Sequence, residues 1–431
     1  MSRQPSFRPR SASLTITAIG ARGDGIARLD GDMVFVPLTV PGDQVAVRID
    51  GRRGDGLTAT VLDITAAGPG RQTPPCPLFG RCGGCALQHV AEPLVAAWKR
   101  QRLAEALCRA GFAAPAVQPT ISIAPGNRRR ATFAVAPGRS GVTVGFNERG
   151  SRRLVDVDKC LLLAPPLVAL LAPLRALLGD IFAAGAAPPG VTGDAVVTLT
   201  ETGIDLLIAA DLRLDLFHRQ RLAAFADAVD LARLSWRSPA TGLDPVACRR
   251  PPAVSFAGAT VELPPGAFLQ PSAAGEAALA ALVTAAVDGA DRVADLYAGC
   301  GSFSFPLAQS AAVHAVEGDA AAVQALSAAV RRSAARISVE HRDLARRPMT
   351  APELKRFDAV VFDPPRAGAA AQAEILASGG PPLVVAISCN PATLARDAGF
   401  LSKGGYRLIG ATPVDQFPWS AHIEAVAVFS R

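Results

Sequence analysis

The second half of the chain, from about residue 256, alternates short apolar stretches with Ala-rich stretches of helical character. This alternation is typical of units in which parallel strands form a sheet and helices cover it. The carboxyl ends of parallel strands lie along one edge of such a sheet, where ligands bind. Several of these strands end in acidic, glycine or cysteine residues. We therefore expect residues 256–431 to form a Rossmann-like catalytic domain with its site on that edge.

The first strands of this half predict a cofactor site. One apolar strand ends at Asp295 and runs into a turn containing Gly299 and Gly301, which lets the backbone approach a ligand closely. The next strand ends in Glu317, a carboxylate suited to the two hydroxyls of a ribose. Because the third glycine of the dinucleotide fingerprint is missing, S-adenosyl-L-methionine fits better than NAD. Asp343, after the following strand, is expected near the adenine.

The later strands end in candidate reacting groups. One strand ends in Asp363, and the next ends in Cys389, a candidate nucleophile. Glu424 opens an apolar strand near the C-terminus and is a candidate general base. A thiolate, a carboxylate and a methyl donor suit methylation of carbon 5 of uracil. Addition of the thiolate to carbon 6 makes carbon 5 nucleophilic, and a base then removes the carbon-5 proton.

Four cysteines predict a metal site. Cys76, Cys82 and Cys85 share a loop rich in glycine, and Cys160 lies far downstream. Thiolates bind zinc or iron–sulfur clusters, and the glycines favour a [4Fe–4S] cluster, although the spacing leaves zinc open. These cysteines are far in sequence from Cys389 and close to a basic segment, so they are expected to organise an RNA-binding surface. Eight cysteines are too few for a disulfide scaffold, which indicates a reducing cytoplasm.

The N-terminal third adds two signs of RNA binding. Residues 12–65 read as several short strands, which predicts an OB-like barrel, a fold that often binds oligonucleotides. Residues 126–153 carry a net charge of +6, most of the +7 of the whole chain. This concentration on expected strands favours a phosphate-binding surface, with Arg128, Arg129 and Arg130 as candidate RNA contacts. No apolar stretch of membrane-spanning length is free of charge and proline, so no membrane span is expected.

Together these patterns predict a multidomain α/β protein. Residues 1–65 are expected to form the OB-like barrel. Residues 66–255 are expected to form a central α+β domain with the cysteines and the basic surface, and residues 256–431 the catalytic domain. A helix expected over residues 91–110 is left free to pack on another domain. No obligate protein partner is evident.

The reactive residues resemble the RNA uracil-5-methyltransferase family. The resemblance rests on four motifs and covers nearly the whole chain. The expected barrel resembles a TRAM domain, and the four cysteines are similar to those of the iron–sulfur branch that modifies 23S ribosomal RNA. The transfer-RNA branch generally lacks both features. The motifs are Gly266-Ala-Phe-Leu-Gln270-Pro-Ser272, Phe362-Asp-Pro-Pro-Arg366, Ser388-Cys-Asn-Pro-Ala-Thr393 and Asp415-x-Phe-Pro-x-x-x-His-x-Glu424.

The resemblance implies roles for individual residues. It makes Cys389 the nucleophile and Glu424 the base, with S-adenosyl-L-methionine as cofactor and 23S ribosomal RNA as partner. It implies that the four cysteines hold a [4Fe–4S] cluster. Tyr297, Ser302 and Ser272 stand where the family usually has Phe, Asn and Asn. The positions that the resemblance assigns to the cofactor or the active site are Gln270, Tyr297, Ser302, Glu317, Asp343 and Asp363.

Other functions remain open at this point. RNA cytosine-5 methylation uses a second cysteine near the position of Asp363, and the chain has none there. Methylation of an amino group uses an aromatic residue where this chain has Arg366, and it needs no Cys389. A non-catalytic RNA-binding iron–sulfur protein would not need Cys389 and Glu424. Methylation of transfer RNA is the alternative within the family.

Overall fold

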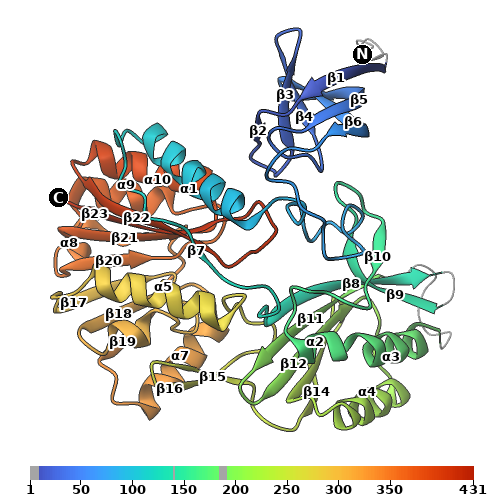
Figure 1. The fold of residues 1–431 in the computed structure, drawn as a ribbon. Helices are drawn as coiled ribbons and strands as arrows, with labels where there is room; N and C mark the ends of the chain where they lie inside the picture. The colour runs from blue at the N-terminus through green and yellow to red at the C-terminus, as the bar shows by residue number, and fades with distance from the viewer. Residues whose placement is uncertain (1–8, 139–140, 184–191) are drawn as a thin grey trace, which may run out of the picture.

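The computed structural model describes residues 9–138, 141–183 and 192–431. Figure 1 shows the three large sheets in separate regions of the molecule. The N-terminal sheet is blue, the central sheet is green, and the C-terminal sheet is mainly orange and red. Arg139, part of the basic segment, lies outside the described residues.

The N-terminal sheet has six strands that curl around an apolar core. Val34, Val47 and Ile49 are completely buried in that core. The strand order is β1-β5-β6-β4-β3-β2, and most neighbours are antiparallel. The short strands predicted for this region are therefore present. They are β1 (Arg10–Thr15), β2 (Ala18–Ile19), β3 (Gly25–Leu29), β4 (Asp32–Val36), β5 (Gln44–Arg53) and β6 (Gly56–Ala66).

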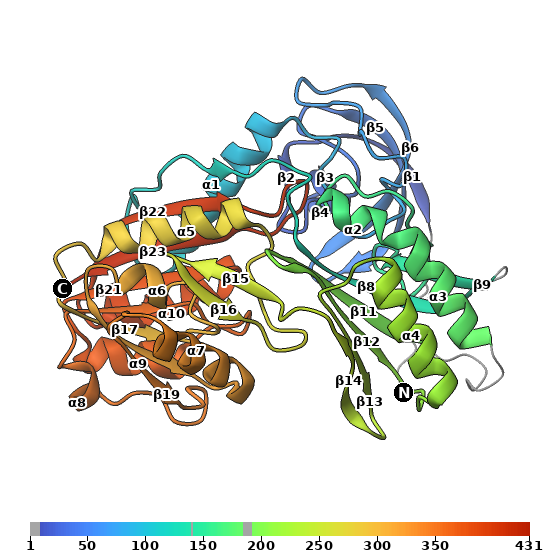
Figure 2. The same ribbon diagram turned by 90° about the horizontal axis from the view of Figure 1, so that it is seen from below.

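The central sheet has seven strands and helices on one face, as Figure 2 shows. The apolar stretch Pro165–Phe182 is long and apolar enough to cross a membrane by composition alone. In the structure its leucines, such as Leu167 and Leu174, pack in the core between this sheet and its helices. In sheet order the strands are β10 (Leu154–Asp156), β9 (Gly141–Asn147), β8 (Arg130–Gly138), β11 (Gly193–Thr200), β12 (Gly203–Ala210), β13 (Arg233–Ser238) and β14 (Gly242–Cys248), and the helices are α2 (Pro165–Ala169), α3 (Leu171–Ala183) and α4 (Leu216–Ala228).

The C-terminal sheet has eight strands between two layers of helices. Its first five strands in sheet order are parallel, and one antiparallel strand is inserted next to them. A small hairpin, β15 (Ala253–Phe256) and β16 (Ala259–Glu262), packs beside it. In sheet order the strands are β19 (Ile337–His341), β18 (Ala312–Glu317), β17 (Arg292–Leu296), β20 (Ala359–Phe362), β21 (Leu383–Ser388), β23 (Glu424–Ser430), β22 (Arg407–Asp415) and β7 (Ile121–Ser122).

The helices of the C-terminal sheet bury its two faces in separate cores. Leu279 and Leu307 belong to the core on one face, whereas Leu376 and Leu401 belong to the core on the other. The doubly covered, mainly parallel sheet expected from the sequence is thus present. The helices are α5 (Ala273–Ala286), α6 (Ser304–Leu307), α7 (Ala320–Arg332), α8 (Ala351–Leu354), α9 (Ala370–Gly379) and α10 (Pro391–Lys403).

The helix expected over residues 91–110 does pack away from the central sheet. It is α1 (Glu92–Arg109), and its Leu103 and Leu107 join the same core as Leu401 of α10. The following β7 pairs with the edge of β22. The segment from α1 to β7 therefore belongs to the C-terminal domain, because α1 packs against α10 and β22 and β7 extends the sheet.

Candidate active site

The cofactor turn follows β17 as the sequence predicts. Tyr297, Gly299 and Gly301 have φ angles of 64°, 56° and 98°, so the backbone turns sharply away from the strand. A Cβ atom on Gly301 would lie 2.7 Å from Leu326 and 2.9 Å from Phe305, so both these contacts and the positive φ would strain a side chain there.

Glu317 braces this turn from the end of the neighbouring β18. Its Oε2 accepts a hydrogen bond of 2.8 Å from the Gly299 amide, and its Oε1 accepts from the amides of Gly318 and Asp319. Asp343 lies beyond β19 with an exposed carboxylate. The expected ribose and adenine carboxylates thus share one end of the sheet, although Glu317 is already engaged with backbone amides.

Asp295 is a buried carboxyl at the tip of β17. Burial raises its pKa to about 7, with smaller contributions from Asp363 and Glu317. The Ser304 hydroxyl donates to its Oδ2 at 2.5 Å, and its Oδ1 has no hydrogen-bond partner among the described residues. The hydrogen bond between Asp295 and Ser304 connects β17, before the turn, to α6, after it.

The candidate reacting groups come together at the tips of three adjacent strands. Asp363 follows β20, Cys389 follows β21, and Glu424 begins β23, which lies on the other side of β21. Burial, with the charges of Glu424 and Asp363, raises the pKa of the Cys389 thiol to about 11, whereas Arg366 acts to lower it. Burial also raises the pKa of Asp363 to about 7. The nearby positive charge of Arg366 is therefore the group that favours the thiolate.

Two glutamine amides connect the two carboxyls. Gln270 Nε2 donates to Asp363 Oδ2 at 3.2 Å. Gln416 Nε2 donates to Gln270 Oε1 at 2.8 Å and to Glu424 Oε2 at 3.2 Å. Glu424 is 4% exposed, and burial followed by the charge of Asp363 raises its pKa well above the usual value. No signal in the sequence pointed to Gln416, because it occupies an unspecified position of its motif.

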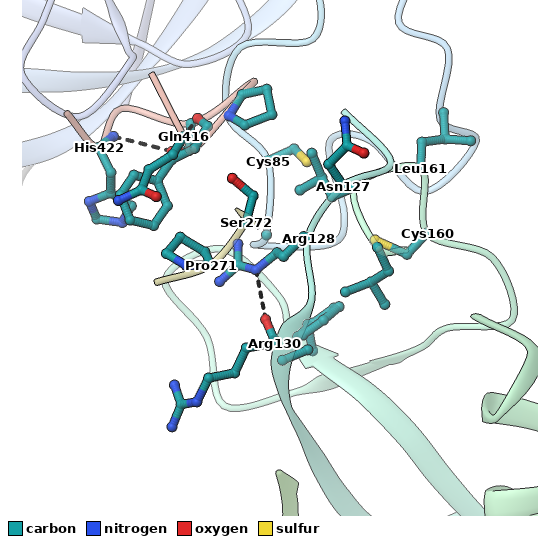
Figure 3. Close-up of a pocket in the computed structure, with 18 of the residues that line it drawn as sticks. Cys85, Asn127, Arg128, Arg130, Cys160, Leu161, Pro271, Ser272, Gln416 and His422 are labelled. Carbon is teal, nitrogen blue, oxygen red and sulfur yellow. Dashed lines mark hydrogen bonds between the residues drawn. The ribbon is translucent and has the colours of Figure 1, made fainter. Parts of the chain in front are cut away.

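A cavity of about 600 Å³ joins the reacting groups to the four cysteines. Cys389 and Glu424 line one part of it, together with Gln270 and His422. In Figure 3, Cys85 and Cys160 lie on one side and His422 and Gln416 on the other, with Arg128 between them. The four cysteines are therefore close to Cys389 in space although they are far from it in sequence. The lining residues with thiol groups are Cys76, Cys82, Cys85, Cys160 and Cys389.

The cysteine loop also touches the segment that leads to Glu424. The backbone amides of Ala86 and Leu87 donate to the carbonyl of Trp419 at 2.8 and 2.9 Å. Trp419 has a φ of 59°, so this contact holds a strained residue in place. The loop thus contacts catalytic structure as well as the basic region beside it.

The four cysteines have the donor set of a soft metal centre. Burial raises the pKa of the Cys160 thiol, although the backbone amides of Leu162 and Leu163 favour its thiolate. Burial also raises the pKa of the Cys85 thiol to about 12, with added repulsion from the other three thiolates. In the described ranges, no group of three or more His, Cys, Asp or Glu side chains is arranged to hold a metal ion. The four thiols line the same cavity.

The three neighbouring arginines have different surroundings. Arg129 pairs with Glu276 at 2.8 Å, and its side chain is only 12% exposed, which differs from the surface position expected for an RNA contact. Arg128 and Arg130 line the cavity, and the guanidinium of Arg130 lies 6.0 Å from the ring of the exposed Phe268. Arg128 and Arg130 can therefore contact a ligand in the cavity. Arg129 instead connects the start of the central sheet to α5 of the catalytic domain through its ion pair with Glu276.

The fold and the site define an RNA methyltransferase with an N-terminal accessory barrel. The TRAM domain family matches residues 12–62, and the tRNA (Uracil-5-)-methyltransferase family matches residues 258–431. An RNA methyltransferase of Brucella suis is 43% identical over 424 residues, which cover 98% of both chains. The 23S rRNA (uracil(1939)-C(5))-methyltransferase RlmD of Chromohalobacter salexigens is 35% identical and covers 97% of this chain and 89% of its own.

The chain belongs to the RNA uracil-5-methyltransferase family, and the enzyme class predicted from its motifs is confirmed. The crystal structure of Pyrococcus abyssi tRNA (uracil-54, C5)-methyltransferase in complex with S-adenosyl-L-homocysteine has the same fold. Its TM-score is 0.76 at 21% sequence identity, and the match covers 97% of this chain and all of that one.

Proposed function

We propose that this enzyme methylates carbon 5 of one uridine in 23S ribosomal RNA, with S-adenosyl-L-methionine as methyl donor, through a covalent bond between Cys389 and carbon 6. The observation that carries this proposal is the meeting of Cys389, Asp363 and Glu424 at the tips of adjacent strands beside an open cavity. The similarity to the Chromohalobacter enzyme supports ribosomal RNA as the substrate. The bacterial cytoplasm is the proposed location.

The first step belongs to Cys389. Its thiolate adds to carbon 6 of a uracil that has left the base stack, and the π electrons of the ring move to the carbonyl oxygen at carbon 4. Arg366 stabilises the thiolate, and Asp363, whose pKa is about 7, can hydrogen bond to the ring in its protonated form. S-adenosyl-L-methionine, when bound, supplies the electrophilic methyl group to which carbon 5 then bonds.

The last step belongs to Glu424. Its carboxylate takes the proton from carbon 5, the electron pair forms the carbon 5–carbon 6 double bond, and the Cys389 thiolate leaves. Because Glu424 is buried with a raised pKa, it is a stronger base than a solvated carboxylate. The amide of Gln416 favours the ionised form that this step needs.

We also propose that Cys76, Cys82, Cys85 and Cys160 hold a [4Fe–4S] cluster. Their shared cavity supports this, and zinc is the alternative. When bound, the cluster supplies a fixed, charged core for the loop. The contacts of that loop with Trp419 indicate a structural role near the active site.

The central experiment separates the roles of Cys389 and Glu424. Cys389→Ala should bind RNA without forming an adduct or transferring methyl. Glu424→Gln should add the thiol and transfer methyl but stall, because losing a general base costs about 10²- to 10⁴-fold in rate. The stalled, methylated RNA should remain on the protein in a denaturing gel. Cys108→Ala and Glu374→Gln, at exposed positions, are matched controls that should turn over normally.

Two outcomes would count against the proposal. Activity in Cys389→Ala would exclude the covalent route, and normal turnover in Glu424→Gln would exclude that base. To identify the RNA, unmodified 23S ribosomal RNA and transfer RNA from a strain lacking the enzyme should be offered in parallel. Methylation of transfer RNA alone would overturn the ribosomal assignment.

A further inference from the structure

Gln416 lies between the base and the cofactor motif. It follows β22 directly, and its side chain is buried. One amide nitrogen serves two acceptors, Gln270 Oε1 and Glu424 Oε2. Both partners are acceptors when Glu424 is ionised, so the hydrogen-bond network requires the amide nitrogen of Gln416 on this side.

The surroundings of Gln416 hold this side chain in one position. A Cβ atom added to Gly275, in the first turn of α5, would lie 2.5 Å from Gln416 Oε1 and 2.8 Å from Gln416 Cβ. The oxygen Oε1 is buried and has no hydrogen-bond partner among the described residues. An amide that leaves one polar atom unpaired while the other contacts a catalytic carboxylate is costly for stability, which favours a functional reason for it.

We propose that Gln416 is a positioning residue for the catalytic base: it aims the Glu424 carboxylate at the carbon-5 proton and links it through Gln270 to Asp363. This inference rests on the proposed role of Glu424. Gln416 lines the same cavity as Cys389 and Glu424, and it acts on the reaction through its hydrogen bond to Glu424. Its contribution belongs to the last step, after methyl transfer, when the ionised carboxylate must accept a proton.

The chemistry gives this role a signature. Loss of a general structural support slows every step, whereas loss of the Gln416 amide slows mainly release of the adduct, the step that Glu424 performs. A hydrogen bond to a charged group is worth enough to change this step by about 10- to 100-fold. The bond favours the ionised carboxylate, so its removal raises the pKa of Glu424. The release rate, which increases with pH as Glu424 ionises, should then increase only at higher pH than in the wild type.

The test uses Gln416→Met, which keeps the volume and removes the donor. Adduct formation on unmodified RNA should be close to the wild-type rate, and release of the methylated RNA should be about 10- to 100-fold slower. Release should be followed from preformed adduct across pH. In that species Cys389 is a thioether and does not titrate, and Asp363, which also faces Glu424, keeps its own bond to Gln270 Nε2 in both proteins.

Two further variants keep the test decisive. Gly275→Ala should displace the amide without deleting it and should also accumulate adduct. Gln372→Met removes another buried glutamine, which bonds the backbone of Met349 far from the site, and should release at the wild-type rate. Equal slowing of adduct formation and release in Gln416→Met would mean a merely structural role.

The outcome also separates this inference from the proposed function. If Glu424→Gln stalls but Gln416→Met releases normally at every pH, the positioning role is wrong and the base assignment stands. If Glu424→Gln does not stall, the base assignment itself fails.

Discussion

A fully buried lysine, Lys99 of α1, gives a clear prediction about stability. Its side chain is 0% exposed, and Nζ lies 2.6 Å from Asp415 Oδ1, on a carboxylate that is itself 9% exposed. Nζ also donates to the carbonyl of Phe417 at 3.3 Å. The change Lys99→Met removes the charge and keeps the apolar stem.

The expected cost follows from what remains buried. At an effective dielectric constant of about 20, charges 2.6 Å apart attract by about 6 kcal/mol, most of which is offset by loss of hydration. Burial is also the largest influence on both pKa values, lowering that of Lys99 and raising that of Asp415. Lys99→Met leaves Asp415 without its partner, and breaking a buried pair in this way costs about 3–5 kcal/mol.

Chemical denaturation followed by tryptophan fluorescence should measure this cost, since Trp98 adjoins Lys99 in the sequence. Lys99→Met combined with Asp415→Asn should be more stable than Lys99→Met alone, because no buried charge is left. Lys355→Met, at an exposed position, should change stability by less than about 0.5 kcal/mol. A Lys99→Met protein as stable as the wild type, or a double variant whose loss equals the sum of the single losses, would refute the reasoning.

Three further predictions concern the metal centre, the nucleophile and the RNA. Protein purified without oxygen should contain about four iron and four sulfide per chain. Cys85→Ser should lose both, whereas one tightly bound zinc would overturn the cluster assignment. Arg366→Gln should raise the pKa of the Cys389 thiol, so its alkylation by iodoacetamide at neutral pH should slow; an unchanged pH profile would contradict this. Replacing Arg128 and Arg130 with Ala should weaken RNA binding and reduce its salt slope by about 0.7 for each phosphate that the protein no longer neutralises, and an unchanged slope would exclude such interactions.

The sequence alone predicted the catalytic edge because its geometry is a property of the backbone. Parallel strands bring their carboxyl ends to one edge whatever side chains they carry, so residues that follow these strands share that edge. Asp363 and Cys389 could be placed together on this ground, and Glu317 could be placed beside the glycine turn. The family motifs then pointed to the enzyme class that the comparisons confirm.

Tertiary packing decided the rest, since it joins residues whose local patterns carry no information about each other. The periodicity of α1 marked its apolar stripe but did not indicate that Lys99 is buried, because its partner Asp415 lies more than 300 residues away. The run of three arginines predicted one charged surface. In the structure Arg129 is instead buried in an ion pair with Glu276, whereas Arg128 and Arg130 line the cavity. The shared cavity of the cysteines and Cys389 likewise exists only because the central and catalytic sheets pack against each other.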